Sequence, residues 1–170
     1  MIAVRVETPL QEAVAALLRQ SDAVAAALYP DAPRRAIDPR TLAVPGTHLL
    51  VARMDGIVAG CCALFEQGEA SAELKRMIVD ARCRGQGIGV ELLRAAEVEA
   101  ARRGITTLRL EVGIHNEAAH AMYVRAGFAP RGPFGSHAAS PISRFLEKPL
   151  SSRSPLPAPG WGATSPSRRG

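Results

Sequence analysis

Apolar residues recur along the first part of the chain with two different spacings, which predict a strand followed by a helix. Residues 2–6 alternate between apolar and polar side chains, as a strand with one exposed face does. Residues 10–28 are rich in Ala, Leu and Val with interspersed polar positions, the pattern of a helix that buries one face. Ser21 followed by Asp22 could cap a second segment, so the pattern is also compatible with a break at this point.

Three apolar runs rich in β-forming residues come next, over 48–53, 57–65 and 72–79. Asp55-Gly56 separates the first two runs, and Asp-Gly between apolar runs is a strong signal for a two-residue hairpin turn. We therefore expect three further strands, of which the first two pair as a hairpin.

The second half of the chain alternates between helices and strands. Helical spacing predicts a long helix over 87–103, which Gly104 ends, and a shorter helix over 116–126. Strands are predicted over 107–112 and 142–147. The order β-α-β-β-β-α-β-α-β indicates an α/β fold, in which helices flank one sheet with mixed strand directions.

Composition divides the chain into a folded part and a tail. The chain has 170 residues, of which 47% are hydrophobic, and this is enough for one domain with a buried core, which we place at 1–150. Residues 151–170 are rich in Pro, Ser and Arg. We expect a disordered tail there, because such a segment cannot bury enough apolar surface to offset the entropy of ordering.

Charge and hydropathy narrow the expected partners and location. The tail holds three arginines and no acid, so it accounts for three of the five net positive charges. The remainder is only mildly basic and aromatic residues make up 4% of the chain, so we expect no nucleic-acid partner. No apolar run approaches the ~20 residues of a membrane helix, and the start lacks the pattern of a signal peptide. We therefore expect a cytoplasmic protein without a membrane partner.

The cysteines and histidines give no sign of a metal site. Cys61, Cys62 and Cys83 have neither the paired spacing of metal ligands nor the arrangement of a disulfide framework, so we expect reduced thiols and no metal. Cys61 and Cys62 lie in an apolar run, where successive side chains point to opposite faces of a strand, and both are expected in the core. Surface or loop positions are expected for the four histidines, which are His48, His115, His120 and His137.

The junction between the predicted strand 72–79 and the long helix is suited to bind an anion. The first turn of a helix has backbone N–H groups without partners, and the helix dipole adds positive charge at the same end. Glycines at three alternate positions keep side chains away from these amides, and Arg82 and Arg84 add full charges. Phosphate is therefore the expected ligand of the turn Arg84-Gly85-Gln86-Gly87-Ile88-Gly89.

This turn resembles the coenzyme A signature Q/R-x-x-G-x-G/A of the GNAT N-acetyltransferases, with Arg84, Gly87 and Gly89 at the motif positions. A later stretch is similar to a second motif of that superfamily, N-x-x-A-x-x-(L/M)-Y-x-x-x-G-F. The matching residues are Asn116, Ala119, Met122, Tyr123, Gly127 and Phe128. The two motifs together cover about residues 71–130. The resemblance implies a mostly antiparallel sheet whose fourth and fifth strands are splayed apart.

The resemblance also implies a reaction, the direct transfer of the acetyl group of acetyl-CoA to a primary amine. Pantetheine would pair with the backbone of Met77, Ile78 and Val79 on the fourth strand, where a backbone amide would polarise the thioester carbonyl. The pyrophosphate would lie on the amides of residues 84–89. Acetyl-CoA is thus the expected cosubstrate.

Candidate catalytic residues follow from the same resemblance. Tyr123 matches the tyrosine that gives a proton to the leaving thiolate. Asn116 matches a residue that contacts coenzyme A, and it also stands where its side chain could cap the short helix. Glu73 is our candidate for the base that deprotonates the amine, because it lies on the fourth strand where some members of the family carry a catalytic glutamate. Glu111 and an ordered water are the alternatives.

Other functions fit parts of the sequence less well. Glu111 lies 22 residues after the last glycine of the turn, as in dinucleotide-binding folds, but the required glycine is replaced by Val90. A P-loop is excluded, because no Lys-Ser/Thr pair follows the glycines. A non-catalytic coenzyme A sensor, or an enzyme that acetylates a protein or peptide amine, remains an alternative.

We expect the acceptor to be a small molecule. The segment 131–141 contains Pro133-Phe134-Gly135 and Ser140-Pro141, which suggest a shaped lid rather than an open groove for a protein chain. The proline-rich stretch 30–47 is a second candidate for selecting the acceptor, and a homodimer is left open.

Overall fold

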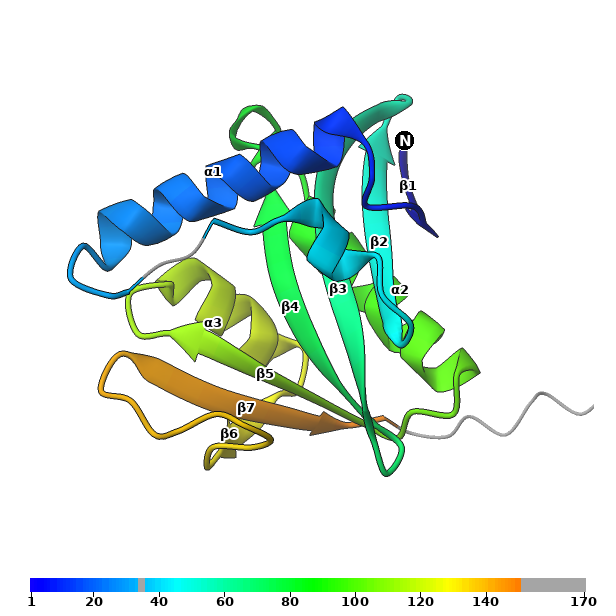
Figure 1. Ribbon diagram of the computed structural model, residues 1–170. Helices are drawn as coiled ribbons and strands as arrows, with labels where there is room; N and C mark the ends of the chain where they lie inside the picture. The colour runs from blue at the N-terminus through cyan, green and yellow to red at the C-terminus, as the bar shows by residue number, and fades with distance from the viewer. Residues whose placement is uncertain (34–35, 151–170) are drawn as a thin grey trace, which may run out of the picture.

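The computed structural model describes residues 1–33 and 36–150, which form a seven-stranded sheet with helices on both faces (Figure 1). The predicted tail, 151–170, lies outside the described residues. In the described part, no helix is both long enough and apolar enough to span a membrane. The elements in chain order are β1 Ile2–Val6, α1 Glu12–Leu28, η1 Pro39–Leu42, β2 Thr47–Met54, β3 Ile57–Gly68, β4 Ser71–Val79, η2 Ala81–Cys83, α2 Ile88–Arg102, β5 Thr107–Gly113, α3 Glu117–Arg125, β6 Ala129–Arg131 and β7 Ser143–Pro149.

The sheet has the strand order β1-β2-β3-β4-β5-β7-β6, and every neighbouring pair is antiparallel except β4 and β5. The predicted mixed, mostly antiparallel sheet is therefore confirmed. The three-residue strand β6 was not predicted. It contains Pro130, which cannot donate a ladder hydrogen bond, and such a strand is tolerated because β6 lies at the edge of the sheet.

Two local predictions, the hairpin turn at Asp55-Gly56 and the first helix, can be compared with the structure. The hairpin turn between β2 and β3 is confirmed, since Asp55 and Gly56 both have positive φ, 52° and 83°, as a type I′ turn requires. The single predicted helix is confirmed and its possible break is not found, because α1 is continuous through Ser21 and Asp22. The helix instead stays regular while its buried side chains, led by Leu17 and Leu18, pack on the sheet.

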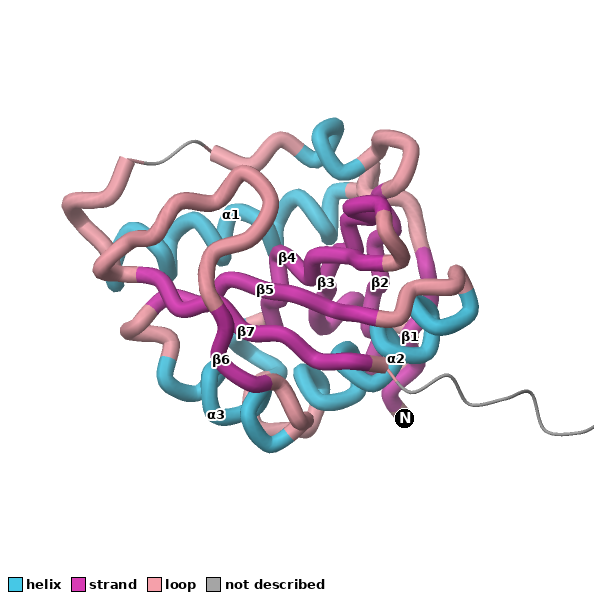
Figure 2. The backbone as a smooth tube through the Cα atoms, turned by 90° about the horizontal axis from the view of Figure 1, so that it is seen from below, coloured by secondary structure: helices cyan, strands magenta, loops and turns pink. Residues whose placement is uncertain are grey.

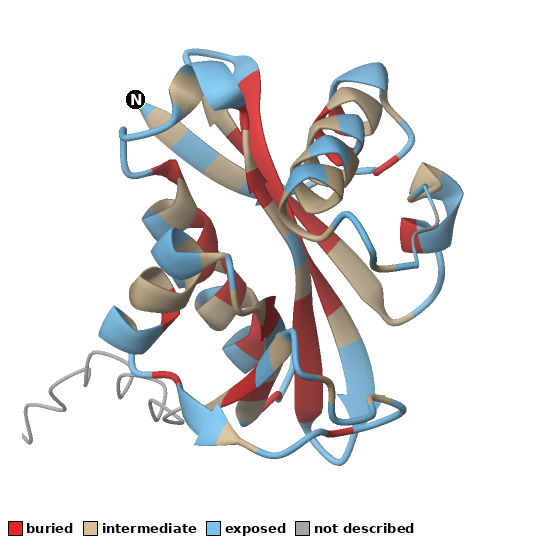
Figure 3. Ribbon diagram, turned by 90° about the vertical axis from the view of Figure 1, so that its left-hand side faces the viewer, coloured by how far each residue is buried: buried red, intermediate tan, exposed pale blue. Residues whose placement is uncertain are grey.

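Successive residues of β3 serve two separate cores, one on each face of the sheet. Cys61 and Ala63 belong to the core under α1, whereas Cys62 and Leu64 belong to the core that α2 covers. All four side chains are fully buried, as predicted for the cysteines. Figure 3 shows the resulting stripes of buried residues along the central strands, with helices on either side.

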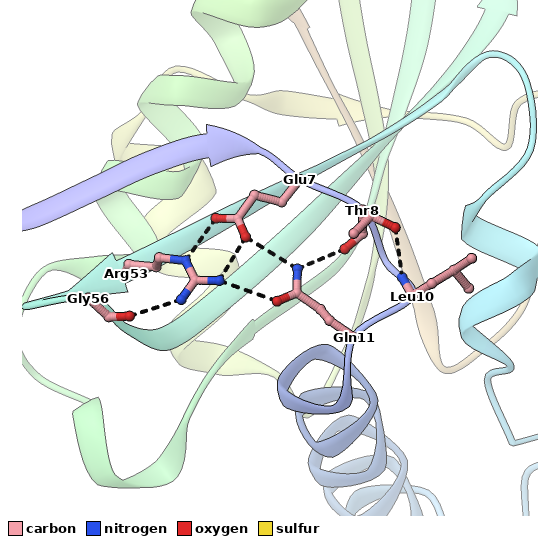
Figure 4. Close-up of polar contacts among 6 residues, drawn as sticks. All are labelled: Glu7, Thr8, Leu10, Gln11, Arg53 and Gly56. Atoms are coloured by element: carbon pink, nitrogen blue, oxygen red, sulfur yellow. Dashed lines mark hydrogen bonds and ion pairs between the residues drawn. The ribbon is translucent and has the colours of Figure 1, made fainter.

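A polar cluster around Arg53 fixes the connection between β1 and α1 (Figure 4). The guanidinium donates to both carboxylate oxygens of Glu7, at 3.0 and 2.8 Å, and to the carbonyl of Gly56 at 2.9 Å. The bidentate contact lowers the pKa of Glu7. Gln11, just before α1, bonds to the same pair, so the start of the helix is attached to the β2–β3 hairpin.

β4 and β5 are paired over only three positions, from Ser71–Thr107 to Glu73–Arg109, and then diverge. Each strand continues beyond this point, β4 to Val79 and β5 to Gly113. Figure 1 shows the two strands opening toward α1 and α3. The predicted splay is thus confirmed, and it leaves part of the β4 edge without a neighbouring strand.

Candidate active site

A cleft of about 560 Å³ lies where β4 and β5 part. Its walls come from the C-terminal half of α1, from β4, β5 and α3, and from the 132–142 loop that joins β6 to β7. Seen from below, this loop folds back over the sheet on the side of α1 (Figure 2). The cleft brings together five of the predicted site residues, which are Glu73, Met77, Ile78, Asn116 and Tyr123.

The predicted phosphate turn lies outside the lining of this cleft, at the N-terminus of α2. Gly85 and Gly87 have φ of 77° and 80°, which only glycine adopts readily, and Gly87 is the N-cap residue without a side-chain cap bond. Among the described residues, no side chain accepts a hydrogen bond from the first amides of α2. Ile88 buries its side chain in the core, so it can offer only its backbone, whereas Arg84 and Gln86 are exposed.

Gly89 has a different reason for being glycine. It lies inside the first turn of α2 with no positive φ, and a Cβ there would lie 3.1 Å from the sulfur of Met122. Val79, at the end of β4, is the next neighbour at 3.8 Å. The absent side chain therefore lets α2 approach α3 closely at the end of β4.

Asp80 organises the turn that leads into α2. Its carboxylate accepts from the backbone N–H of Arg82 at 2.9 Å and from both Nε and Nη2 of that guanidinium at 3.1 Å. These bonds lower the pKa of Asp80 to about 2. Gln20 of α1 also donates to Asp80 and accepts from the N–H of Ala81. Arg82 is thus engaged by Asp80, while Arg84 makes no ion pair with a described residue.

A bulge in β4 interrupts its pairing with β3 beside the cleft. The register shifts between Cys61–Ile78 and Ala63–Lys75, and Arg76 takes up φ of 58°. Arg76 is exposed and lines the cleft. Beyond the bulge, Met77 and Ile78 border the cleft along the unpaired edge of β4, whereas Val79 lies outside its lining.

Tyr123 lies on α3 with 6% of its surface exposed, and it borders the cleft. Its ring packs edge-on against Phe128 at a centroid distance of 5.7 Å. Burial raises the pKa of Tyr123 far above its usual value, so the phenol keeps its proton. Within the described part of the chain its hydroxyl makes no hydrogen bond, which leaves it able to donate toward the cleft.

Asn116 stands at the N-cap position of α3, but its side chain does not cap the helix, so that prediction is wrong. Its Oδ1 instead accepts a hydrogen bond of 2.5 Å from the hydroxyl of Tyr29, which follows α1. The same hydroxyl accepts from the N–H of His115 at 3.0 Å. A Cβ at Gly113 would overlap this hydroxyl, so the glycine makes room for Tyr29. Nothing in the local sequence around Tyr29 indicated this contact.

The predicted base, Glu73, is buried at the base of the fork between β4 and β5. Its carboxylate contacts Nε2 of His137 at 2.8 and 3.1 Å and Nζ of Lys75 at 3.4 Å. Nδ1 of His137 contacts Oε2 of Glu111 at 3.0 Å, and Oε1 of Glu111 accepts from Ser143 at 2.5 Å. Glu73 and Glu111, the two candidate bases, are thus joined through one imidazole.

The expected loop position of His137 is confirmed, but the residue is not on the outer surface, because it lies in the cleft with 20% of its side chain exposed. Phe134, which is buried, holds the loop down and packs against the His137 ring at 5.0 Å. The partners of His137 are 64 and 26 residues away in the chain, so no spacing rule could reveal them.

Residues 13–128 match the model of the Acetyltransferase (GNAT) family, which is more than half of the chain. The chain belongs to this family. It is accordingly an N-acetyltransferase that uses acetyl-CoA, so the expected reaction class and cosubstrate are confirmed.

Relatives of this GNAT enzyme match between 49% and 89% of its length. An IAA acetyltransferase of Azospirillum brasilense is 43% identical over 145 residues, which are 85% of this chain and 95% of that protein. An aminoalkylphosphonate N-acetyltransferase of Salmonella typhimurium is 33% identical over 89 residues, which are 49% of this chain and 58% of that protein. The solved structure of a Klebsiella pneumoniae protein described as an acyl-CoA N-acyltransferase matches with a TM-score of 0.76 and 34% identity, over 89% of this chain and 99% of that one.

Proposed function

We propose that this GNAT enzyme acetylates the primary amine of a small molecule in the cleft between β4 and β5. One observation carries the proposal. A buried carboxylate, Glu73, and a buried phenol, Tyr123, border the same cleft as the unpaired edge of β4 at Met77 and Ile78. A base, an acid and backbone donors are the groups that direct transfer to an amine requires.

Acetyl-CoA is proposed to bind along the α2 side of the fork. Its pyrophosphate would lie on the amides of residues 84–89, with Arg84 as the nearby cation without an internal ion pair. Its pantetheine would follow the free edge of β4 at residues 77–79, and Asn116 would border it from the β5–α3 turn. The thioester would then lie between Glu73 and Tyr123.

The reaction needs one base and one acid at this point. Glu73 takes a proton from the acceptor ammonium, so an N–H bond breaks and an O–H bond forms. The free amine attacks the thioester carbonyl, and the C–S bond of the tetrahedral intermediate breaks. Tyr123 gives its proton to the departing sulfur, and the second proton that the attacking nitrogen loses replaces it on the phenolate oxygen. The products are an N-acetyl amine and coenzyme A, with Tyr123 restored and one proton held by Glu73.

Two observations support a small acceptor. The cleft has about 560 Å³, the size of a small-molecule site, and the 132–142 loop, which buried Phe134 anchors, covers one side of it. Two relatives carry names that refer to IAA and to aminoalkylphosphonates.

A panel of acceptors tests the proposal. Release of free thiol from acetyl-CoA is measured with amino acids, aminoalkylphosphonates, polyamines, aminoglycosides and a peptide with a free N-terminus. We expect acceptor-dependent thiol release with at least one small amine, and the N-acetyl product in the mass spectrum. Turnover with the peptide alone would contradict the small-molecule assignment, and thiol release that no acceptor stimulates would contradict the proposed transfer.

A further inference from the structure

The proposed base is almost entirely buried, although the reaction must release a proton. Only 2% of the Glu73 side chain is exposed, so little of its surface is available for direct proton transfer to water. The exposed fraction rises along the contacts described above, to 20% for His137 and 37% for Glu111. The three side chains thus form a hydrogen-bonded line from a buried oxygen to one at the surface.

We propose that His137 and Glu111 carry the acceptor's proton from Glu73 to solvent, a role that rests on the proposed function of Glu73. After the amine is deprotonated, the O–H bond of Glu73 breaks and an Nε2–H bond forms on His137. The imidazolium then loses its Nδ1 proton to Glu111, which passes it to water. Once the product has left, the Nε2 proton is lost to water in the open cleft, which His137 lines, and water returns a proton to Nδ1 through Glu111. Each turnover releases one proton, as the conversion of an ammonium and a thioester to an amide and a thiol requires.

The geometry favours this direction of transfer. Each ring nitrogen faces a carboxylate, so a proton taken up at Nε2 from Glu73 and one given up at Nδ1 to Glu111 both pass between atoms already in contact, at 2.8 and 3.0 Å. The ring cannot turn freely, because Phe134 and Phe145 pack against it at 5.0 and 5.7 Å. Ser143 fixes the outer carboxylate through its bond to Oε1 of Glu111.

Other charged groups lie near this line. On β4, Lys75 contacts Oε2 of Glu73 at 3.4 Å, the oxygen that also lies 3.1 Å from Nε2 of His137, and Arg76 lines the cleft without an ion pair to a described residue. On the side of β6 and β7, Arg131 stacks over Phe134 and pairs with Glu147, which also contacts Arg109 of β5. In the described residues no group of three acidic, histidine or cysteine side chains is placed to hold a metal ion.

His137→Gln is the principal test, because glutamine can bond to one carboxylate but cannot take up and pass on a proton. We expect kcat to fall at least about 10²-fold with the acetyl-CoA KM unchanged, and the defect to shrink as pH rises and the acceptor loses its own proton. His48→Gln is the matched control. His48 also contacts a carboxylate, Glu66 at 3.1 Å, but lies outside the cleft, so its rate should match the wild type.

Two further variants distinguish proton transfer from a purely structural role of His137. One is tested by chemical rescue, and the other changes the outer carboxylate, Glu111. In His137→Ala, added imidazoles of similar size should restore the rate in proportion to their pKa, since proton transfer depends on basicity. Glu111→Gln changes an exposed side chain and should lower kcat at pH 7 without a loss in melting temperature. Rescue that ignores the pKa of the added imidazole, or normal kcat in both His137→Gln and Glu111→Gln, would overturn the proposal.

Glu73→Gln distinguishes a failure of the proposed proton relay from a failure of the proposed function. If Glu73→Gln loses activity while His137→Gln keeps it, the proton leaves by another route and only the present inference fails. If Glu73→Gln also keeps the wild-type rate, the base itself is misassigned and both fail.

Discussion

The two ends of the catalytic fork are built by different means. The proposed phosphate turn at 84–89 is contiguous in sequence and offers backbone amides, with left-handed glycines at positions 85 and 87 before α2. The proposed proton-handling end consists of side chains from β4, β5 and the 132–142 loop, joined at His137. Backbone sites of this kind impose a glycine spacing on the chain, whereas side-chain sites depend on how distant segments meet. The first end can therefore be predicted from the sequence. At the second end, the way in which the side chains are brought together is seen only in the three-dimensional structure.

Gly87→Glu should give the largest effect, a loss of acetyl-CoA binding, because it changes the central residue of the proposed phosphate turn. The substitution puts a carboxylate beside amides that are expected to hold phosphate, at a φ of 80° that disfavours side chains. We expect acetyl-CoA binding to disappear in calorimetry. Gly56→Glu is the control, since Gly56 has nearly the same φ, 83°, equally open surroundings and a place in a distant hairpin. Equal loss of acetyl-CoA binding in both variants would indicate that backbone strain alone is the cause. Unchanged acetyl-CoA affinity in Gly87→Glu would show that the pyrophosphate does not bind at this turn.

Tyr123→Phe should come next, and it probes the chemistry between the two ends. The ring and its contact with Phe128 remain, while the proton for the thiolate is lost, so kcat should fall by ~10²–10⁴ with little change in acetyl-CoA affinity. Because burial raises the pKa of Tyr123, the wild-type phenol stays protonated as pH rises. The wild-type kcat should therefore show no alkaline decline due to this group up to pH 10. A decline near pH 10 that Tyr123→Phe abolishes would show instead that the phenol ionises in this range.

The contrast between the two ends explains which predictions succeeded. Hydrophobic periodicity and Asp55-Gly56 were sufficient for every strand except β6 and for the first hairpin, because these signals act over a few residues. The contact of Tyr29 with Asn116 joins residues 87 positions apart, and the space for it depends on Gly113. No local rule encodes such a meeting. Asn116 accordingly satisfied the sequence pattern of a helix cap while its side chain bonded elsewhere.

Asp80→Asn should have a smaller effect, because it weakens the support of the phosphate turn and leaves its amides in place. Loss of the charged hydrogen bonds to Arg82 should destabilise the fold by about 1–3 kcal/mol at pH 7. The pKa of Asp80 is lowered to about 2 against about 3.9 in an unfolded chain, so this stabilisation is complete above pH 4 and disappears as pH falls toward 2. Denaturant unfolding at pH 7 and at pH 3 should therefore give a difference between variant and wild type that shrinks with acid.

Asp38→Asn is a matched control for this effect. Asp38 caps η1 and pairs with Arg40 two residues later, as Asp80 does with Arg82 in η2. Its side chain is 41% exposed against 7% for Asp80, so solvent replaces most of what the substitution removes. A larger loss of stability in Asp38→Asn than in Asp80→Asn would contradict the role of burial.

The smallest expected effect concerns the thiols, which report where the phosphate turn meets solvent. Burial raises the pKa of Cys61 to about 12 and that of Cys62 further still, so neither forms a reactive thiolate near neutral pH. Cys83 is only half-buried and stands between Arg82 and Arg84 before α2. Limited alkylation followed by peptide mass spectrometry should find Cys83 labelled first, and acetyl-CoA should slow its labelling severalfold. Free coenzyme A should protect equally, because the expected shield is the pyrophosphate and not the acetyl group. Labelling of Cys61 or Cys62 before Cys83 would mean that the sheet exposes its thiols more readily than the turn does. Lack of protection of Cys83 by either ligand would show that the pyrophosphate does not bind near Cys83.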